Sequence, residues 1–189
     1  MPAQPPPTPS QTVGPFFHGA LSYGAGPRLV DPSRPDAIRL SGVVRDGAGD
    51  PVPDGLVEIW QAGLDGTFPT ATNPYAEPGA FRGFGRCATD DGGAYGFVTL
   101  KPGEVPTTDG TPQAPHIAMS VFARGLLQRL VTRVYFTDET AANATDPLLR
   151  LLGTDRAATL LAGEVPGGYR FDVRMQGEQE TVFLDVFGG

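Results

Sequence analysis

The chain has 189 residues, of which 40% are hydrophobic and 19% charged, a length and composition typical of one folded globular domain. Its formal net charge of −7 disfavours nucleic acid and anionic membranes as partners, because both are negatively charged. Cys87 is the only cysteine, which excludes an internal disulfide and a cysteine metal cluster.

The first 36 residues are predicted to form an N-terminal arm and connector. Residues 1–11 are rich in proline and favour an extended, polyproline-like conformation. Gly14 and Pro15 then predict a bend, which two large phenylalanine rings follow. Such a segment either lies across another chain or packs on its own domain, and the pattern favours neither. Because it lacks the basic and apolar regions of a secretory signal, and no apolar run reaches membrane-spanning length, we expect a cytoplasmic protein that does not contact membranes.

Residues 37–189 are predicted to form one all-β domain. The 26 glycines and 20 prolines indicate many turns, and the segments between them alternate apolar and polar residues as half-buried strands do. Seven or eight short strands at roughly regular spacing predict an antiparallel β-sandwich with long loops. The predicted strands are residues 38–44, 56–61, two strands flanking a turn at 90–93, then 116–122, 130–136, 169–175 and 181–187.

Three local signals mark turns and helices. In the turn at residues 90–93, two aspartates precede two glycines, which are expected to supply the positive φ of a tight hairpin. Asp146 is followed by a proline, the pattern of a helix N-cap and first turn, so a short helix is predicted at residues 147–152 with Gly153 as its end. A further helical turn is predicted at residues 156–162.

The strand at residues 116–122 carries one of the two histidines. Because side chains alternate along a strand, His116 and Ala118 share one face, while the apolar residues between them face the core. One histidine cannot hold a catalytic metal, since such sites generally need three or more protein ligands. Most acidic residues lie in glycine-rich turns, where they make turn hydrogen bonds. These features alone identify no enzyme.

A family resemblance is carried by four motifs, LVEIWQAGLDGTF, GRCATDDGGAYGFVTLKPG, PHIAMSV and LVTRVYF. In order and spacing they resemble the intradiol ring-cleaving dioxygenases, from about residue 14 to residue 187. The resemblance implies a β-sandwich that cleaves a catechol ring between its two hydroxyl-bearing carbons. It also implies ferric iron, which the iron-bearing members hold with two tyrosines and two histidines of an H-x-H strand motif.

Three of the four ligand positions implied by the resemblance have lost their donor atoms. The first tyrosine position, eight residues after the tryptophan of the WQA motif, is Phe68, and the second, after the KPG motif, is Val105. The H-x-H pair is reduced to His116 and Ala118. Active members place an arginine three residues before this pair, where this chain has Gln113. Phenylalanine, valine and alanine side chains have no lone pair to donate, so this chain is expected to bind no metal.

Some members of the family combine two related chains, and this sequence resembles the metal-free kind. The resemblance implies a hetero-oligomer in which a homologous beta chain binds the ferric iron. The implied substrate is the aromatic acid protocatechuate, which O₂ converts to 3-carboxy-cis,cis-muconate. The residues expected to reach the active site of the partner chain are Thr12, Gly14, Pro15 and Arg133.

Arg133 lies among apolar neighbours, where an unpaired cation is costly, so we expect a carboxylate near it. The carboxylate of the substrate and a carboxylate across the interface between the chains are the two alternatives.

Two other functions stay open for the chain as a whole. One is a stand-alone β-sandwich that binds a ligand or a structural partner without catalysis. The other is a self-sufficient dioxygenase with a different ligand set, which the low histidine content disfavours.

Overall fold

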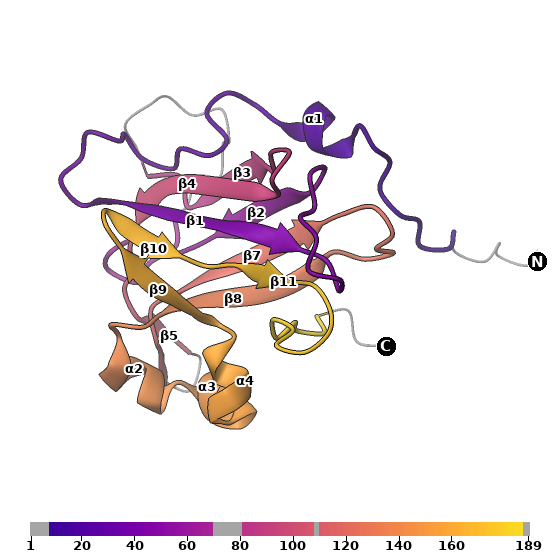
Figure 1. The fold of residues 1–189 in the computed structure, drawn as a ribbon. Coiled ribbons are helices and arrows are strands. Elements are labelled where there is room, and N and C mark those ends of the chain that lie inside the picture. Colours follow the sequence, from indigo (N-terminus) through magenta and orange to yellow (C-terminus); the bar gives the residue numbers. More distant parts are fainter. Residues whose placement is uncertain (1–7, 70–80, 108–109, 187–189) are drawn as a thin grey trace, which may run out of the picture.

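The computed structural model describes residues 8–69, 81–107 and 110–186 (Figure 1). Residues 1–7 of the proline-rich arm and residue 187 of the last predicted strand lie outside this part. The strands are β1 (Ala37–Arg45), β2 (Leu56–Trp60), β3 (Phe84–Ala88), β4 (Ala94–Leu100), β5 (Val105–Pro106), β6 (Pro112–Gln113), β7 (His116–Phe122), β8 (Leu130–Phe136), β9 (Leu161–Val165), β10 (Gly168–Arg170) and β11 (Val173–Arg174). The helices are α1 (Phe17–Leu21), α2 (Thr140–Thr145), α3 (Pro147–Leu152) and α4 (Thr154–Ala158).

Nine of the strands form one sheet that bends over at β9. Its order is β11-β1-β10-β9-β8-β7-β2-β3, and β4 pairs with the other side of β1. The strands β1, β4, β10 and β11 lie over β2, β3, β7 and β8 in Figure 1. The main core fills the space between these two layers, with Leu40 and Phe97 from one layer and Ile59, Ile117 and Val134 from the other. The predicted sandwich-like all-β fold is therefore confirmed.

The prediction of a purely antiparallel sheet is wrong, because three of the pairings are parallel. They join β1 to β10, β1 to β11, and β8 to β9. Parallel neighbours require a crossover connection, since a tight turn can only reverse the chain. The segment between β8 and β9 is such a crossover and contains α2, α3 and α4. The sequence pattern shows which residues alternate but not the direction in which the chain returns.

The local turn and helix signals have the expected structural effects, with one difference. The Oδ1 atom of Asp90 accepts the backbone N–H groups of Gly92 at 2.9 Å and of Ala94 at 2.8 Å. Of the two glycines in this turn, Gly93 alone has positive φ, at +72°. The helix predicted at residues 147–152 is confirmed as α3, and Asp146 caps it by accepting two backbone N–H groups.

The C-terminal quarter departs most from the sequence predictions. The helical turn predicted at residues 156–162 is wrong in its second half, where β9 begins at Leu161. The predicted strand at 169–175 is divided into β10 and β11. Asp172, which lies between them, accepts the backbone N–H of Val43 on β1 at 2.9 Å. A side chain there takes the place of a backbone partner and interrupts the ladder.

The last predicted strand, at residues 181–187, is also not formed over its described residues. Thr181 and Leu184 make single backbone hydrogen bonds, the former to Arg174 and the latter to Val131. Val182 is buried beside the helices, which explains the apolar alternation of this segment. The alternation therefore reflects an extended segment with one buried face and not a strand in a ladder.

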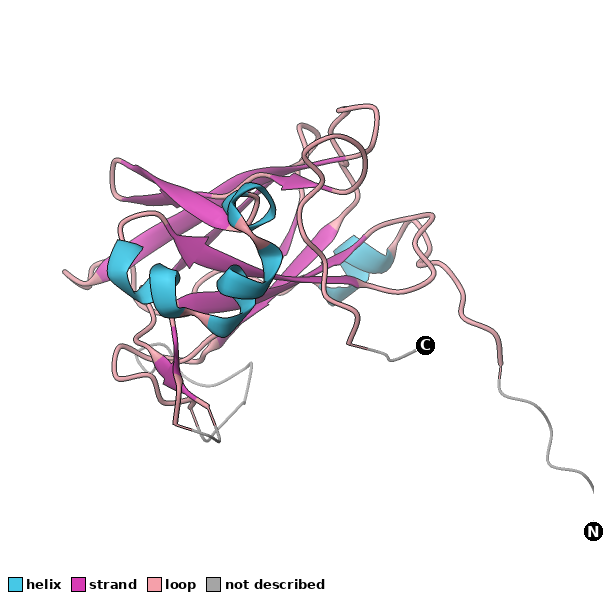
Figure 2. Ribbon diagram, turned by 90° about the horizontal axis from the view of Figure 1, so that it is seen from below, coloured by secondary structure: helices cyan, strands magenta, loops and turns pink. Residues whose placement is uncertain are grey.

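The helices α2, α3 and α4 lie across one end of the sheet (Figure 2). Beneath them a second, smaller core contains Ala114, Tyr135, Leu149, Leu160 and Val182. No helix in the described part of the chain is long and apolar enough to cross a membrane. This second core buries Tyr135 near the end of β8 and Ala114, two residues before β7.

The described part of the N-terminal segment both enters the core and lies on the surface. Leu29 is 1% exposed and its backbone N–H donates to Val98 on β4 at 2.8 Å. Phe16, by contrast, is 83% exposed just before α1. The division of the chain into residues 1–36 and residues 37–189 stays a prediction.

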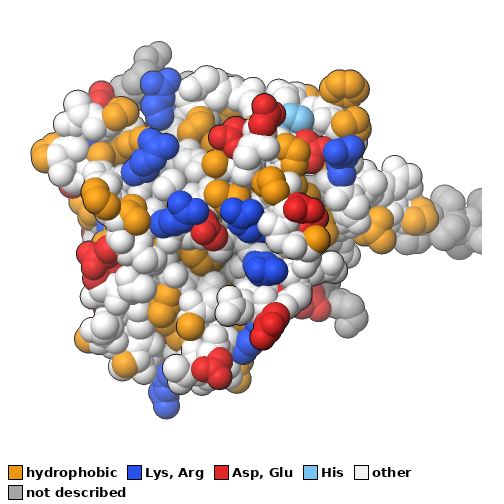
Figure 3. Space-filling model, in the orientation of Figure 1, with side chains coloured by type: hydrophobic (Ala, Val, Ile, Leu, Met, Phe, Trp, Pro, Cys, Tyr) orange, Lys and Arg blue, Asp and Glu red, His pale blue; other side chains and the backbone are white. Residues whose placement is uncertain are grey.

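Charged side chains of both signs are interspersed on the face that carries β1, β10 and β11 (Figure 3). Arg170 and Asp172 form one ion pair of this kind, with 3.1 Å between nitrogen and oxygen. Exposed pairs of this type contribute little to stability. This face therefore presents no extended surface of one charge.

Candidate functional site

The four positions that the family resemblance assigns to iron ligands are joined through their neighbours around β7. Ala118 pairs with Trp60 on β2 and with Arg133 on β8. The Trp60 ring stacks on Phe68, with 5.7 Å between ring centroids and 11° between ring planes. We call Phe68, Val105, His116 and Ala118 the vestigial site.

Val105 joins the same region from the other side. It pairs with Gln113 in the small sheet formed by β5 and β6, and Gln113 in turn accepts a hydrogen bond from Arg133. The loop before Phe68 packs closely on the loop before Val105. A Cβ atom on Gly66, whose φ is +76°, would lie 1.9 Å from the carbonyl oxygen of Glu104, so only glycine fits there. The tertiary structure thus links the segments that carry Phe68, Val105 and Ala118 to the region around β7.

His116 is the one residue of the vestigial site with a lone pair to donate. It is 8% exposed, and its Nδ1 lies 2.8 Å from the carbonyl oxygen of Ala114. A carbonyl oxygen only accepts, so Nδ1 carries the proton of the neutral ring. Burial, and after it the positive charge of Arg133, lowers the pKa of His116 to about 4. The ring is therefore neutral at neutral pH.

The side chains at the vestigial site do not fit the ferric ion of the family. Phe68, Val105 and Ala118 offer no oxygen, nitrogen or sulfur atom, so His116 is left as a single ligand. Over the described ranges, no group of three or more His, Cys, Asp or Glu side chains is placed to hold a metal ion. No chemical step through iron bound to this chain follows from such a donor set.

Arg133 is held by neutral partners. Its Nη1 donates to Oε1 of Gln113 at 2.7 Å and to the Tyr135 hydroxyl at 3.3 Å. That hydroxyl donates to Oδ1 of Asp146 at 3.1 Å. Burial raises the pKa of Tyr135 to about 12, so the phenol stays neutral. Within the described part of the chain, Arg133 forms no ion pair with a carboxylate.

Sequence reasoning predicted a role for Arg133 and placed Tyr135 beside it, but it did not connect Asp146 with either residue. The alternation of residues 130–136 puts Tyr135 on the same face as Arg133, and its hydroxyl lies 3.3 Å from Nη1 of Arg133. Asp146 was recognised as a helix cap, but no local pattern connects a helix cap with a strand 11 residues earlier. That connection arises from the crossover between β8 and β9.

The structure does not bring the N-terminal arm to Arg133 within one chain. Thr12 accepts the backbone N–H of Gly125 through Oγ1 at 2.7 Å, in the loop after β7. The carbonyl of Gly14 accepts the N–H of Phe17, whose ring lies 5.5 Å from that of Phe122 at the end of β7. Arg133 pairs with Ala118, nearer the start of that strand.

Thr12, Gly14 and Pro15 are exposed. Between the arm and the loop after β7 lies a cavity of about 250 Å³ lined mostly by apolar side chains. The described part of the arm therefore packs in part on its own domain while these three residues face outward.

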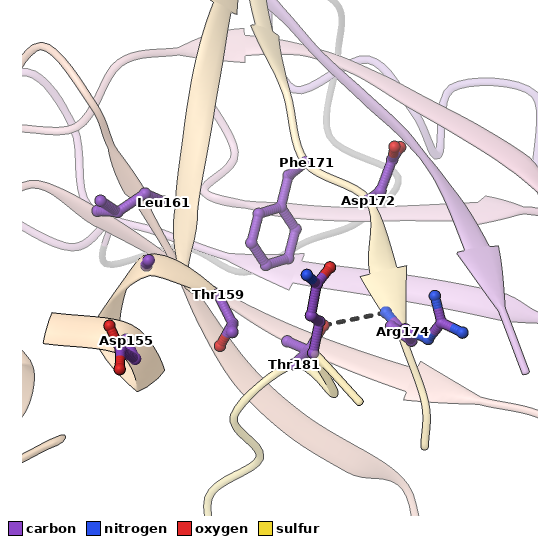
Figure 4. Close-up of a pocket in the computed structure, with 9 residues that line it drawn as sticks. Asp155, Thr159, Leu161, Phe171, Asp172, Arg174 and Thr181 are labelled. Carbon is purple, nitrogen blue, oxygen red and sulfur yellow. Dashed lines mark hydrogen bonds between the residues drawn. The ribbon is translucent and has the colours of Figure 1, made fainter. Parts of the chain in front are cut away.

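A larger cavity of about 470 Å³ lies between α4 and the strands β9 to β11, away from the vestigial site (Figure 4). Its hydroxyl groups take part in backbone hydrogen bonds. Thr181 accepts the N–H of Arg174 at 3.0 Å, and Thr159 accepts the N–H of Val182 at 3.1 Å. These bonds tie the extended C-terminal segment to the domain, so the hydroxyls have a structural role.

The fold is that of a dioxygenase. The family model described as Dioxygenase matches residues 30–177, and the chain belongs to this family, which confirms the predicted intradiol dioxygenase membership. It is 45% identical to the protocatechuate 3,4-dioxygenase alpha chain of Pseudomonas putida, over 95% of this chain and 96% of that one. It is 35% identical to the protocatechuate 3,4-dioxygenase beta chain of Burkholderia cepacia, over 86% of this chain and 75% of that one.

A solved structure shows the same fold. The dioxygenase domain of a dioxygenase carbohydrate-binding protein fusion from Streptomyces sp. SirexAA-E superimposes with a TM-score of 0.58. The two are 25% identical, and the match covers 92% of this chain and all of that domain. The similarity therefore extends through the sheet that carries the vestigial site.

Proposed function

We propose that this chain is the metal-free alpha subunit of a cytoplasmic protocatechuate 3,4-dioxygenase and assembles with a homologous beta chain that holds the iron. Intradiol dioxygenases use ferric iron. The observation that carries the proposal is the vestigial site, where Phe68, Val105 and Ala118 offer no donor atom at three positions that the family resemblance assigns to iron ligands. The higher identity to an alpha chain than to a beta chain supports the same assignment.

The proposed reaction is one step in aromatic catabolism, in the β-ketoadipate pathway. The carbon–carbon bond between the two hydroxyl-bearing carbons of protocatechuate breaks, and each of these carbons gains one atom of O₂. The two carbons become carboxylates, so the product is 3-carboxy-cis,cis-muconate and the hydroxyl protons are released. In this proposal the iron chemistry takes place in the partner subunit, and this chain shapes the pocket.

Arg133 is the residue of this chain best suited to bind the substrate. Its Nη1 is occupied by Gln113 and Tyr135, whereas Nε and Nη2 make no hydrogen bond to the described residues. These two nitrogens form the edge of a guanidinium that binds a carboxylate through two parallel hydrogen bonds. A carboxylate of protocatechuate, or one across the subunit interface, would offset the cost of a half-buried cation.

Thr12, Gly14 and Pro15 are proposed to contribute to the wall of the partner's pocket. Their exposure and their position at the opposite end of β7 from His116 suit a contact made in another chain. Interfaces between permanent partners commonly bury more than about 2,000 Å², and such chains do not persist as free monomers. The exposed Phe16 beside these residues is the kind of side chain that such an interface covers.

The test is expression of this chain alone and together with an iron-bearing beta homologue. Alone, it is expected to hold no stoichiometric iron and to show no tyrosinate-to-iron charge-transfer colour. Together, the two chains are expected to co-purify with iron and to convert protocatechuate. A coloured preparation of this chain alone with one iron per chain would disprove the proposal. A stable free monomer that does not bind the beta homologue would favour the alternative of a stand-alone binding module.

A further inference from the structure

We infer that Tyr135 and Gln113 are positioning residues that fix the orientation of the Arg133 guanidinium, and that the buried Asp146 fixes Tyr135. The inference rests on the proposed function, because it concerns how Arg133 recognises the substrate carboxylate. It assigns to these residues a role in selecting substrates that carry this group.

The geometry at Arg133 fixes one nitrogen and leaves an edge for a ligand. Nη1 carries two hydrogens, and it has two acceptors, Gln113 at 2.7 Å and Tyr135 at 3.3 Å. Two acceptors on one end of a planar group restrict its rotation as well as its position. The Nε and Nη2 edge then has a fixed direction, as bidentate recognition of a carboxylate requires.

Tyr135 is itself fixed by a rigid anchor. Asp146 is 0% exposed, and its Oδ1 accepts the Tyr135 hydroxyl together with the N–H groups of Leu148 and Leu149. Its Oδ2 accepts the N–H of Ala114 at 3.0 Å. One carboxylate thus joins the start of α3, the segment before β7 and the hydroxyl that faces Arg133. The orientation of this hydroxyl is set by the backbone of two separate elements.

The hydroxyl of Tyr135 also separates two opposite charges. It donates to Asp146 and accepts from Arg133, and no nitrogen of Arg133 lies within ion-pairing distance of a described carboxylate. In a direct ion pair, Asp146 would neutralise the positive charge of Arg133 within the chain. With the neutral hydroxyl between them, Arg133 keeps its charge for an external carboxylate while its position is still fixed. This arrangement distinguishes a positioning role from simple structural support.

The effect is expected on the binding of acidic substrates and not on turnover in general. Loss of one hydrogen bond to Arg133, in Tyr135→Phe or Gln113→Met, is expected to raise KM for protocatechuate about fivefold. Loss of the charge in Arg133→Leu is expected to raise it about tenfold or more. For catechol, which lacks the carboxylate, KM is expected to change less than about twofold in each variant, and kcat to change little for both substrates.

The experiment uses the complex purified with the iron-bearing beta chain. For each variant, the fold decrease in kcat/KM for protocatechuate is divided by the fold decrease for catechol. Assembly of each variant complex is checked by size exclusion and iron content. Tyr169→Phe is the matched control. Its hydroxyl also donates to an aspartate, Asp138 at 2.9 Å, but on β10. The expected ratio is about one for this control, about five for Tyr135→Phe and Gln113→Met, and about ten for Arg133→Leu.

Each outcome decides between the claims. If the ratio is near one for Tyr135→Phe or Gln113→Met but high for Arg133→Leu, the residue with the low ratio does not position Arg133. The proposed function is not affected by that result. A ratio near one for Arg133→Leu in an intact complex means that Arg133 does not sense the substrate carboxylate, and the inference fails with it. If Tyr135→Phe does not assemble, Gln113→Met decides, because its side chain lies in the small sheet outside the buried core.

Discussion

Asp146→Ala tests whether one buried carboxylate holds the second core and the vestigial site together. The side chain is fully buried and accepts four hydrogen bonds, from three backbone N–H groups and the Tyr135 hydroxyl. Alanine removes all four acceptor contacts without adding bulk. The helix α3 loses its cap, and two buried donors outside this helix lose their partner.

The expected loss of stability follows from these contacts. Loss of the helix cap costs about 1 kcal/mol. Ala114 is 1% exposed and lies in the second core, and leaving its buried N–H without a partner costs about 1–3 kcal/mol. The Tyr135 hydroxyl adds a smaller cost, because it still contacts Arg133. The total is about 2–5 kcal/mol, above the typical effect of a point mutation.

The assay is thermal unfolding of the complex, with subunit concentrations held equal because assembly stabilises the fold. A loss of this size corresponds to a decrease in Tm of about 4–20 °C for a domain of this length. Asp146→Ser keeps a cap oxygen and is expected to recover about 1 kcal/mol. Asp155→Ala, at an exposed position in the first turn of α4, is the matched control and is expected to change stability by less than about 0.5 kcal/mol.

A loss below about 1 kcal/mol for Asp146→Ala would refute the reasoning, since the cap alone accounts for that amount. Equal losses for Asp146→Ala and Asp146→Ser, both above about 3 kcal/mol, would assign the effect to the tertiary contacts and not to the cap. In either variant that assembles, KM for protocatechuate is expected to rise as it does for Tyr135→Phe.

Three further predictions concern pH, metal and the N-terminal arm. Burial lowers the pKa of His116 to about 4 from its ordinary 6.5. Between these pH values the unfolded chain binds a proton that the folded chain does not. The free energy of unfolding, at its full value above pH 6.5, is therefore expected to fall by up to about 3 kcal/mol as the pH drops to 4. His116→Asn is expected to flatten this part of the stability profile in urea unfolding, and an unchanged slope would show that another group is responsible. A triple variant that restores donor atoms, Phe68→Tyr, Val105→Tyr and Ala118→His, is expected to bind measurable iron and to show a tyrosinate-to-iron absorption band. A folded triple variant without iron and without colour would mean that these positions do not share one site. Thr12→Val removes an acceptor for a backbone N–H and is expected to raise KM of the complex about fivefold while Thr12→Ser does not, and equal KM values would separate the arm from the partner's pocket.

The sequence by itself determined the features that depend on neighbouring residues. The alternation over residues 116–122 and 130–136 predicted β7 and β8, because the side-chain period of a strand is local. The pair Asp146 and Pro147 predicted α3 for the same reason, since cap and first turn are adjacent in the chain. The family resemblance also predicts that Phe68, Val105 and Ala118 stand at ligand positions, and their side chains carry no donor atom.

The tertiary structure decided what depends on residues far apart in the chain. The parallel pairing of β8 with β9, and the extended path after residue 180, follow from how the helical crossover returns. Asp146 meets the N–H of Ala114, 32 residues earlier, and the hydroxyl of Tyr135, 11 residues earlier, only because that crossover places α3 against β8. A buried carboxylate requires every available donor around it, and those donors come from whichever segments the fold brings together. The connection of Asp146 to Arg133 through Tyr135 could therefore not be identified from local sequence patterns alone.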